Sequence, residues 1–173
     1  MTEKTRVLVV DDDPAIRKLL ERVAVRAGFT VETARDGVEA LELLEVNQYE
    51  IAIVDLMMPR LSGYELVQKI SEIDPRPVVL VATAMANADV ATLDDSMVRR
   101  VIRKPFDIKA ISDVLIETER QIEERRALAN EGVKVAPEGA VLPVLVPRSS
   151  APEPEPRITA DSDDENAAPK RVS

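Results

Sequence analysis

Several short apolar segments of the chain are each followed at once by a residue suited to phosphate chemistry. The residues in these places are Asp11, Asp12, Asp55, Thr83 and Lys104. Carboxylate oxygens are the ligands that Mg²⁺ prefers, while an ammonium group and a hydroxyl can hold the oxygens of a phosphoryl group. If the apolar segments bring their ends together, this set has the parts that phosphoryl transfer onto a carboxylate requires.

The apolar segments have the pattern of strands buried on both faces, as in a parallel sheet covered by helices. The predicted strands are Arg6–Val10, Phe29–Ala34, Ile51–Asp55, Val78–Thr83 and Val98–Arg103. Helical periodicity lies between and after them, over 14–27, 37–46, Tyr64–Ile73, Asn87–Met97 and 108–129. Strand and helix thus alternate five times, which predicts one parallel sheet with right-handed crossovers. The carboxyl ends of such strands lie on one edge of the sheet.

The helical segments begin and end with recognisable signals, and each has an apolar face. Asp13 before Pro14 fits a helix cap, Asp36 with Glu39 fits a second, and Ser62 with Glu65 a third. The residues expected to face the sheet are Ile16, Leu19, Leu20 and Val23, then Val38, Leu41 and Leu44, and finally Ile108, Ile111, Leu115 and Ile122.

Three carboxylates at one sheet edge need a reason to stay together. Asp11, Asp12 and Asp55 would repel one another by about 4 kcal/mol per close pair at an effective dielectric near 20. A divalent cation removes this conflict, and oxygen ligands without histidine or thiolate favour Mg²⁺. Asp55 is then the candidate nucleophile, with Lys104 and Thr83 beside it.

Composition narrows the classes of function. The chain of 173 residues has no cysteine and no histidine, which excludes disulfides, thiolate or histidine metal sites, serine–histidine triads and a phosphohistidine donor. Its net charge of −9 gives no support for broad nucleic-acid binding. No apolar stretch approaches the roughly 20 residues of a membrane span, and the N-terminus turns acidic too early for a signal peptide. We expect a cytoplasmic protein that does not contact membranes.

The amino-acid composition of the chain changes after about residue 130. Seven of the twelve prolines lie between Pro137 and Pro169, and acidic residues are frequent there. We therefore expect one domain over residues 1–129 and a disordered, proline-rich acidic tail over 130–173. The apolar segment Ala140–Val146, broken by Pro143, is interpreted as linker in preference to a docking element, and the tail has no pattern of a DNA-binding domain.

Four motifs in this order and spacing resemble the receiver domain of two-component response regulators. They are VLVVDDDP, IAIVDLMMPRLSG, VLVATA and IRKPF, and the similarity runs from roughly Arg6 to Ile122. The resemblance implies a flavodoxin-like (βα)5 fold, an α/β doubly wound parallel sheet with strand order 2-1-3-4-5. It also implies a cis bond between Lys104 and Pro105.

The same resemblance implies a role for each candidate residue. Asp55 would accept a phosphoryl group from the phosphohistidine of a sensor histidine kinase or a phosphotransfer protein. Asp11, Asp12, Asp55 and the backbone carbonyl of Met57 would hold Mg²⁺. Thr83 and Lys104 would contact the phosphoryl group, so the protein would catalyse only its own phosphorylation and dephosphorylation.

One position departs from the family pattern. Receivers usually carry an aromatic residue three positions before the lysine, where this chain has Val101, and larger residues occupy the preceding loop at 96–100. We therefore expect complete phosphoacceptor chemistry with a different means of signalling through the last strand. Arg99, Arg100 and Arg103 fit either protection of an edge strand or a docking surface.

Three hypotheses about output follow. The first is a monomeric or weakly dimeric receiver that acts by contact with a downstream protein and not by binding DNA. The second is a regulated homodimer formed through an extended last helix, against which Arg125 and Arg126 count. The third, a phosphatase like the haloacid dehalogenases, uses the Asp-x-Asp at 11–13 but lacks the expected threonine or valine, because Ala15 stands there.

Overall fold

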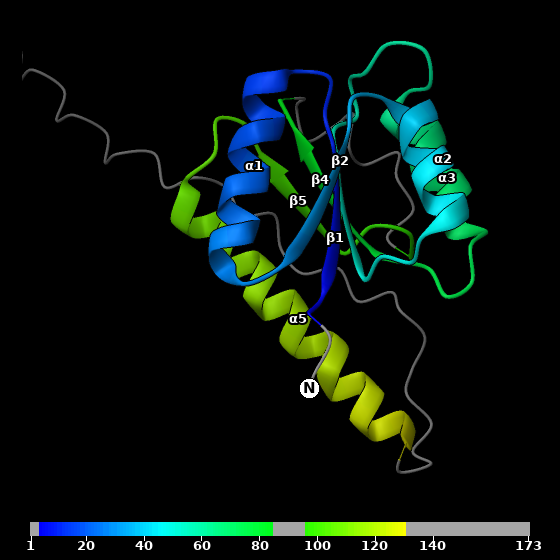
Figure 1. Cartoon of the computed structure of the whole chain (residues 1–173), viewed down its shortest axis with the longest axis vertical. Helices are drawn as coiled ribbons and strands as arrows, with labels where there is room; N and C mark the ends of the chain where they lie inside the picture. Colours follow the sequence, from blue (N-terminus) through cyan, green and yellow to red (C-terminus); the bar gives the residue numbers. More distant parts are fainter. Residues whose placement is uncertain (1–3, 85–95, 131–173) are drawn as a thin grey trace, which may run out of the picture.

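The protein is described by a computed structural model that covers residues 4–84 and 96–130. The described residues form five strands and four helices (Figure 1). They are β1 Arg6–Val10, α1 Pro14–Ala27, β2 Thr30–Ala34, α2 Gly37–Val46, β3 Ile51–Val54, α3 Gly63–Ser71, β4 Val78–Thr83, β5 Arg100–Arg103 and α5 Ile108–Asn130. Most of the predicted helix Asn87–Met97 and of the tail 130–173 lies outside the described residues.

The five strands form one parallel sheet in the order β2-β1-β3-β4-β5, as the resemblance implied. Val10 at the end of β1 pairs with Val54 at the end of β3, and Thr83 of β4 pairs with Arg103 of β5. The residues that follow these strands therefore leave the sheet from the same edge. The fold is an α/β flavodoxin-like sheet with helices on both faces.

Side chains alternate between the two faces of each strand. In β1, Val7 and Val9 face the cluster that contains α1 and α5, while Leu8 and Val10 face the cluster that contains α2 and α3. Figure 1 shows the same two layers, with α1 and α5 on one side of the sheet and α2 and α3 on the other. Both faces of the central strands are thus buried, which explains their wholly apolar sequences.

The predicted helix caps are confirmed. The Asp13 carboxylate accepts hydrogen bonds from the N–H of Ala15 at 2.7 Å and of Ile16 at 3.3 Å, and α1 ends at Gly28 with a φ of 109°. Ser62 and Glu65 form a full capping box at the start of α3. These caps fix where α1 and α3 begin, shortly after the carboxyl ends of β1 and β3.

Two residues predicted to face the sheet are exposed instead. Val38 is 40% exposed and Ile108 is 56% exposed, although their periodicity matched the buried stripes of α2 and α5. Both lie in the first turn of their helix. Strand β5 also begins at Arg100 and not at Val98, because Val98 and Arg99 lie in the bend that precedes the strand.

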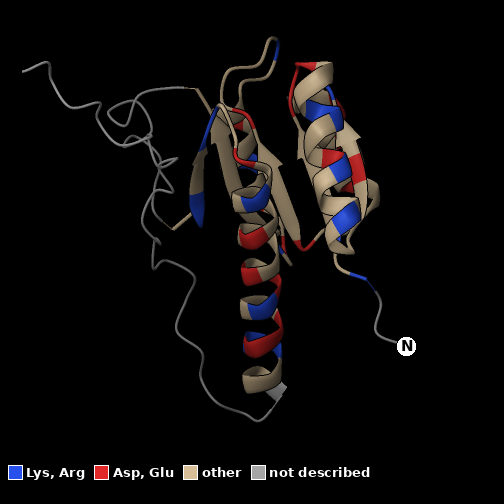
Figure 2. Ribbon diagram, turned by 90° about the vertical axis from the view of Figure 1, so that its left-hand side faces the viewer, with Lys and Arg blue, Asp and Glu red and all other residues tan. Residues whose placement is uncertain are grey.

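Helix α5 continues well past the sheet, as Figure 1 shows. Acidic and basic residues both lie along this helix (Figure 2). Lys109 and Asp113 form an ion pair at 2.6 Å, one turn apart in the helix. Near its end, Arg126 pairs with Glu50 just before β3 at 3.2 Å. None of the described helices is both long and apolar enough to cross a membrane.

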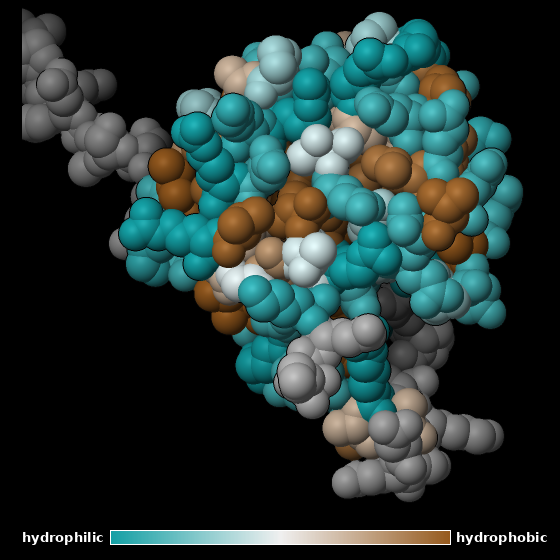
Figure 3. All heavy atoms as spheres, viewed as in Figure 1, coloured by the Kyte–Doolittle hydropathy of each residue, from teal (hydrophilic) through white to brown (hydrophobic). Residues whose placement is uncertain are grey.

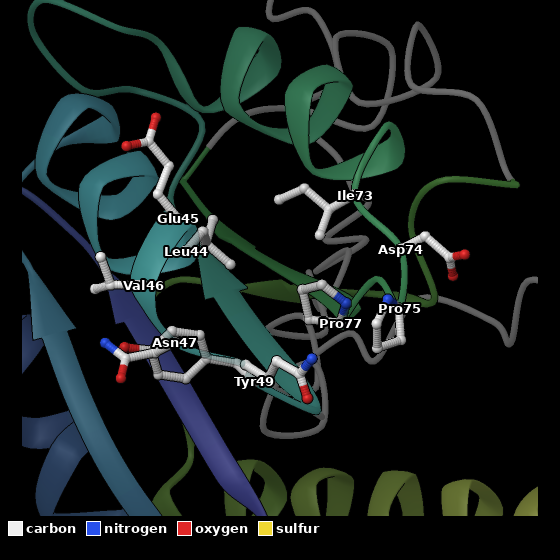
Figure 4. A pocket seen from close by; sticks show the side chains of 10 residues that line it. Leu44, Glu45, Val46, Asn47, Tyr49, Ile73, Asp74, Pro75 and Pro77 are labelled. Carbon is white, nitrogen blue, oxygen red and sulfur yellow. The ribbon is translucent and has the colours of Figure 1, made fainter.

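The surface in Figure 3 is mostly hydrophilic, with apolar residues gathered in small separate patches. A hollow of about 470 Å³ lies between the end of α2 and the connection from α3 to β4 (Figure 4). It is lined by Leu44, Glu45, Val46, Asn47, Gln48, Tyr49, Ile73, Asp74, Pro75 and Pro77. This hollow lies at the amino ends of the strands, opposite the edge that carries the acidic residues.

Candidate functional site

Three carboxylates meet at the carboxyl edge of the sheet. Asp11 follows β1 and is 0% exposed, Asp55 follows β3 and is 5% exposed, and Asp12 is exposed to solvent. One oxygen from each lies within 4.8 Å of the others. The backbone N–H of Asp55 donates to Val10 at 2.9 Å, which extends the pairing of β1 with β3 and holds the two buried carboxylates side by side.

Lys104 closes this cluster from the other side. Its Nζ donates to Asp11 Oδ2 at 2.6 Å and to Asp55 Oδ2 at 2.7 Å, and its side chain is only 17% exposed. Burial lowers the pKa of Lys104, but its hydrogen bonds to Asp11 and Asp55 outweigh burial, so the pKa is raised overall. The ammonium group therefore stays charged, and the bond from Lys104 to Pro105 is cis as expected.

The buried carboxylate of Asp11 is only partly compensated. Burial raises the pKa of Asp11 above its ordinary value, even though the Lys104 ammonium opposes that shift. The N–H of Asp13 also donates to Asp11 Oδ1 at 3.0 Å. One lysine therefore leaves two buried carboxylates and Asp12 with excess negative charge, which a further cation would relieve.

The donor set fits Mg²⁺. The groups at the cluster are carboxylate oxygens, the ligands of a hard dication, and the chain has no histidine or cysteine to favour a softer metal. Asp12 faces solvent, which leaves a side of the cluster accessible. Met57 is 61% exposed and its N–H donates to Asp55 Oδ1 at 3.2 Å, while its carbonyl as a fourth protein ligand remains a prediction.

Thr83 is the last residue of β4, the strand next to β3, and it is fully buried. Its carbonyl accepts the N–H of Lys104 at 3.0 Å, so the two residues leave the sheet together. The structure therefore brings all five residues proposed from the sequence to the same sheet edge.

Two further residues shape the site without having been singled out from the sequence. Arg17 donates from its Nη1 to the carbonyl of Asp11 at 2.6 Å and to that of Asp12 at 3.4 Å, which holds the acidic turn. Gly63 begins α3 so close to the acceptor that an added Cβ would lie 2.0 Å from the Asp55 carbonyl oxygen. In the sequence, Arg17 is marked only by its place one helical turn after the cap Asp13. Gly63 is marked only by its place directly after the capping serine Ser62.

The position that usually holds an aromatic residue is part of the core. Val101 is buried, pairs with Val81 of β4 and belongs to the cluster on the α2 and α3 side. Of the two methionines after Asp55, Met57 is exposed and Met58 is buried in the same cluster. The first is thus available to a partner, whereas the second is packing.

Comparison with known proteins agrees with this geometry. A family model described as the response regulator receiver domain matches residues 7–116. Response regulator MprA of Mycobacterium sp. (strain KMS) is 41% identical over 108 residues, which cover 61% of this chain and 46% of that protein. Transcriptional regulatory protein CseB of Streptomyces avermitilis is 34% identical over 107 residues, which cover 62% and 46%. The chain spans just under half the length of these curated relatives.

Solved receiver structures share the fold. Chemotaxis response regulator CheY4 of Vibrio cholerae aligns with a TM-score of 0.62 at 26% identity, covering 67% of this chain and 99% of that one. Response regulator TrrA of Thermotoga maritima, solved in complex with Mg(2+)-BeF, aligns with a TM-score of 0.60 at 28% identity, covering 66% and 98%. Receiver domains are signalling modules, not conventional enzymes, and they interact with histidine kinases or other phosphodonors. This chain belongs to the response regulator receiver domain family of two-component systems.

Proposed function

We propose that this protein accepts a phosphoryl group on Asp55 from the phosphohistidine of a sensor histidine kinase or phosphotransfer protein, with Mg²⁺ bound. The observation that carries the proposal is the contact of Lys104 Nζ with both Asp11 and Asp55, beside a third carboxylate at Asp12. An oxygen of the Asp55 carboxylate attacks phosphorus while the bond from phosphorus to the imidazole nitrogen breaks. The bonding electrons leave with the imidazole, and Asp55 becomes an acyl phosphate.

Each neighbour of Asp55 has a part in this transfer. The Lys104 ammonium, already 2.7 Å from the acceptor, offsets the negative charge that arrives with the phosphoryl oxygens. The Thr83 hydroxyl donates a hydrogen bond to one of them. The carboxylates of Asp11, Asp12 and Asp55 and the Met57 carbonyl hold Mg²⁺, which when bound supplies the remaining positive charge.

The same groups support the loss of the phosphoryl group to water. The acyl phosphate at Asp55 is a mixed anhydride, and attack by water on phosphorus returns the carboxylate and releases phosphate. The protein therefore acts on its own phosphoryl group and does not turn over outside phosphate esters. A phosphatase of the haloacid dehalogenase type would hydrolyse p-nitrophenyl phosphate, and we expect no such turnover.

For output we propose contact between a domain over residues 1–129 and a downstream protein, with residues 130–173 as a proline-rich acidic tail. The acidic composition and the absence of a DNA-binding pattern after residue 130 support this proposal. The relatives named as transcriptional regulators match over less than half of their length. The similarity therefore does not assign the regulatory output of these relatives to this chain.

Labelling with acetyl phosphate tests the acceptor. Intact mass spectrometry should show one added phosphoryl group on the wild type with Mg²⁺ and none with EDTA. Asp55→Asn should remain unlabelled, whereas Asp113→Asn, which removes an exposed carboxylate of α5, should be labelled like the wild type. A labelled Asp55→Asn variant, or a wild type that takes no label, would contradict the proposal.

Sedimentation velocity distinguishes the two forms of output. A receiver that acts as a monomer keeps its sedimentation coefficient when beryllofluoride is added with Mg²⁺. A dimer formed through α5, which extends to Asn130, would sediment faster in that condition. An unchanged monomer would remove the dimer hypothesis.

A further inference from the structure

We propose that Arg60 and Asp36 are positioning residues for the site. Their ion pair holds the loop over residues 55–62, between β3 and α3, in the shape that metal and phosphoryl binding at Asp55 requires. The inference rests on the proposed function, because it assigns these two residues a role in the chemistry of Asp55. Neither belongs to the acidic cluster, and the sequence marked Asp36 only as the cap of a helix.

The two ends of this loop are fixed by the main chain. At its start, the N–H of Asp55 donates to the Val10 carbonyl at 2.9 Å. At its end, Ser62 caps α3, and the N–H of Gly63 donates back to the Leu56 carbonyl at 3.1 Å. The ends therefore meet at the base of the loop, and the tip needs separate support.

The tip is supported by the turn before α2. Arg60 has a φ of 69°, and it is the one non-glycine residue with positive φ in the described part of the chain. This left-handed conformation is unfavourable for a residue with a Cβ atom, so a contact must hold it. The guanidinium group forms an ion pair with Asp36, and Leu61 lies so close to Gly37 that an added Cβ there would be 2.8 Å away.

The geometry of Asp36 shows why this contact is strong. Its side chain is buried, and its Oδ1 accepts the N–H of Val38 at 2.9 Å and of Glu39 at 3.0 Å as the cap of α2. Its Oδ2 faces Arg60. A buried carboxylate without a partner is costly, so burial of Asp36 draws the guanidinium of Arg60 into place. Arg35 lies farther from Oδ2, at 3.7 Å.

The same loop carries the groups of the site. Asp55 is its first residue, and Met57, whose carbonyl is the proposed fourth ligand, lies three residues before Arg60. If Arg60 at the tip of the loop loses its contact with Asp36, the backbone that carries the Met57 carbonyl can change direction. Groups that orient metal ligands from outside the coordination shell commonly alter metal affinity by about ten- to a hundredfold when removed.

The sign of the effect separates this role from simple electrostatics. Loss of a positive charge near an acidic cluster would by itself strengthen Mg²⁺ binding. Loss of the support for the loop would weaken it. A weaker affinity after removal of Arg60 can therefore come only from a change in geometry.

The test compares Mg²⁺ affinity, measured by isothermal titration calorimetry, in four variants of the full chain. Arg60→Gly removes the guanidinium at a φ that glycine adopts freely, and Asp36→Asn keeps the cap acceptor but removes the charge. We expect each to weaken Mg²⁺ binding by about tenfold, and the double variant to be no weaker than either. Arg35→Gln, the matched control, removes the other cation beside Asp36 and should bind Mg²⁺ at least as tightly as the wild type.

Acetyl phosphate labelling of the same variants completes the test. The labelling rate should fall at limiting Mg²⁺ and return to the wild-type rate at saturating Mg²⁺. Unchanged or tighter Mg²⁺ binding by Arg60→Gly overturns the inference. If the melting temperature of this variant falls while its Mg²⁺ affinity stays unchanged, the ion pair only stabilises the fold, and the inference is overturned as well. A wild type that binds Mg²⁺ but takes no label would remove the proposed function, while calorimetry would still decide the role of Arg60.

Discussion

Lys104 and Asp55 are in direct contact, with Nζ 2.7 Å from Oδ2, although β4 lies between the strands that carry them. The lysine side chain therefore crosses the end of β4, where Thr83 lies, to reach the acceptor. It makes the same contact with Asp11, which follows the next strand along. One ammonium group thus joins the ends of three strands and places a positive charge where phosphoryl oxygens would arrive.

Removal of this charge should destabilise the metal-free protein. Lys104→Met leaves two buried carboxylates close together, and loss of one partner of a buried ion pair costs about 3 kcal/mol of unfolding free energy. Urea unfolding in EDTA measures the loss, and saturating Mg²⁺ should restore part of it. Lys109→Met breaks an exposed pair with Asp113 and should cost less than about 1 kcal/mol. Equal losses in the two variants would contradict this account of Lys104.

Mg²⁺ should itself stabilise the wild type. At a free concentration ten times the dissociation constant, binding to the folded state alone adds about 1.4 kcal/mol to the free energy of unfolding. Asp12→Ala should abolish this gain while changing stability in EDTA by less than about 0.5 kcal/mol, because Asp12 is exposed. Asp13→Asn neutralises the next carboxylate but preserves the cap of α1, so it should keep the gain. A Mg²⁺ response in Asp12→Ala would remove Asp12 from the proposed ligands.

The sheet and its functional edge were predictable because they depend on strong local patterns. A strand buried on both faces has no polar position, so Val7–Val10 and Ile51–Val54 were recognisable, and the acids after them marked the carboxyl edge. Parallel pairing then requires these ends to lie together. The strand order came from the resemblance, since periodicity alone does not order strands within a sheet.

Other features depend on tertiary contacts that periodicity does not contain. Val38 and Ile108 match the apolar stripes of their helices but are exposed in the first turn. The contact of Arg60 with Asp36 joins two loops and depends on the left-handed conformation of Arg60. Likewise, nothing in the sequence around Gly63 shows that the Asp55 carbonyl approaches it.

The hydroxyl of Tyr49 should give folding a dependence on alkaline pH. Burial and the hydrogen bond that Tyr49 donates to Glu32 raise its pKa above the ordinary value of 10.0. The folded state therefore keeps its proton where the unfolded state loses it, so this stabilisation is complete below pH 10 and declines as pH rises above 10. Denaturant unfolding at several values between about pH 8 and pH 11, on both sides of the ordinary tyrosine pKa, measures how the free energy of unfolding changes with pH.

Tyr49→Phe should remove this part of the slope and cost about 1 kcal/mol at neutral pH through the lost hydrogen bond. Tyr64→Phe, which leaves the bond from Tyr49 to Glu32 in place, is the matched control and should keep the slope. If Tyr49→Phe loses stability with the same pH dependence as the wild type, the raised pKa of Tyr49 is not a source of alkaline instability.

Gly63 should be indispensable to the site because its neighbours are main-chain atoms. In Gly63→Ala, the new Cβ would lie 2.0 Å from the Asp55 carbonyl oxygen and 2.6 Å from the Leu56 Cα, so the acceptor or α3 must move. Overpacking of this kind costs about 1–3 kcal/mol of unfolding free energy, and displacement of Asp55 should slow labelling by acetyl phosphate as well. Gly28→Ala is the matched control, since its φ of 109° imposes strain of about 1 kcal/mol but no atom lies within 4 Å of the added Cβ. Equal labelling rates in the two variants, measured by mass spectrometry below their melting temperatures, would show that Asp55 tolerates a shift of α3.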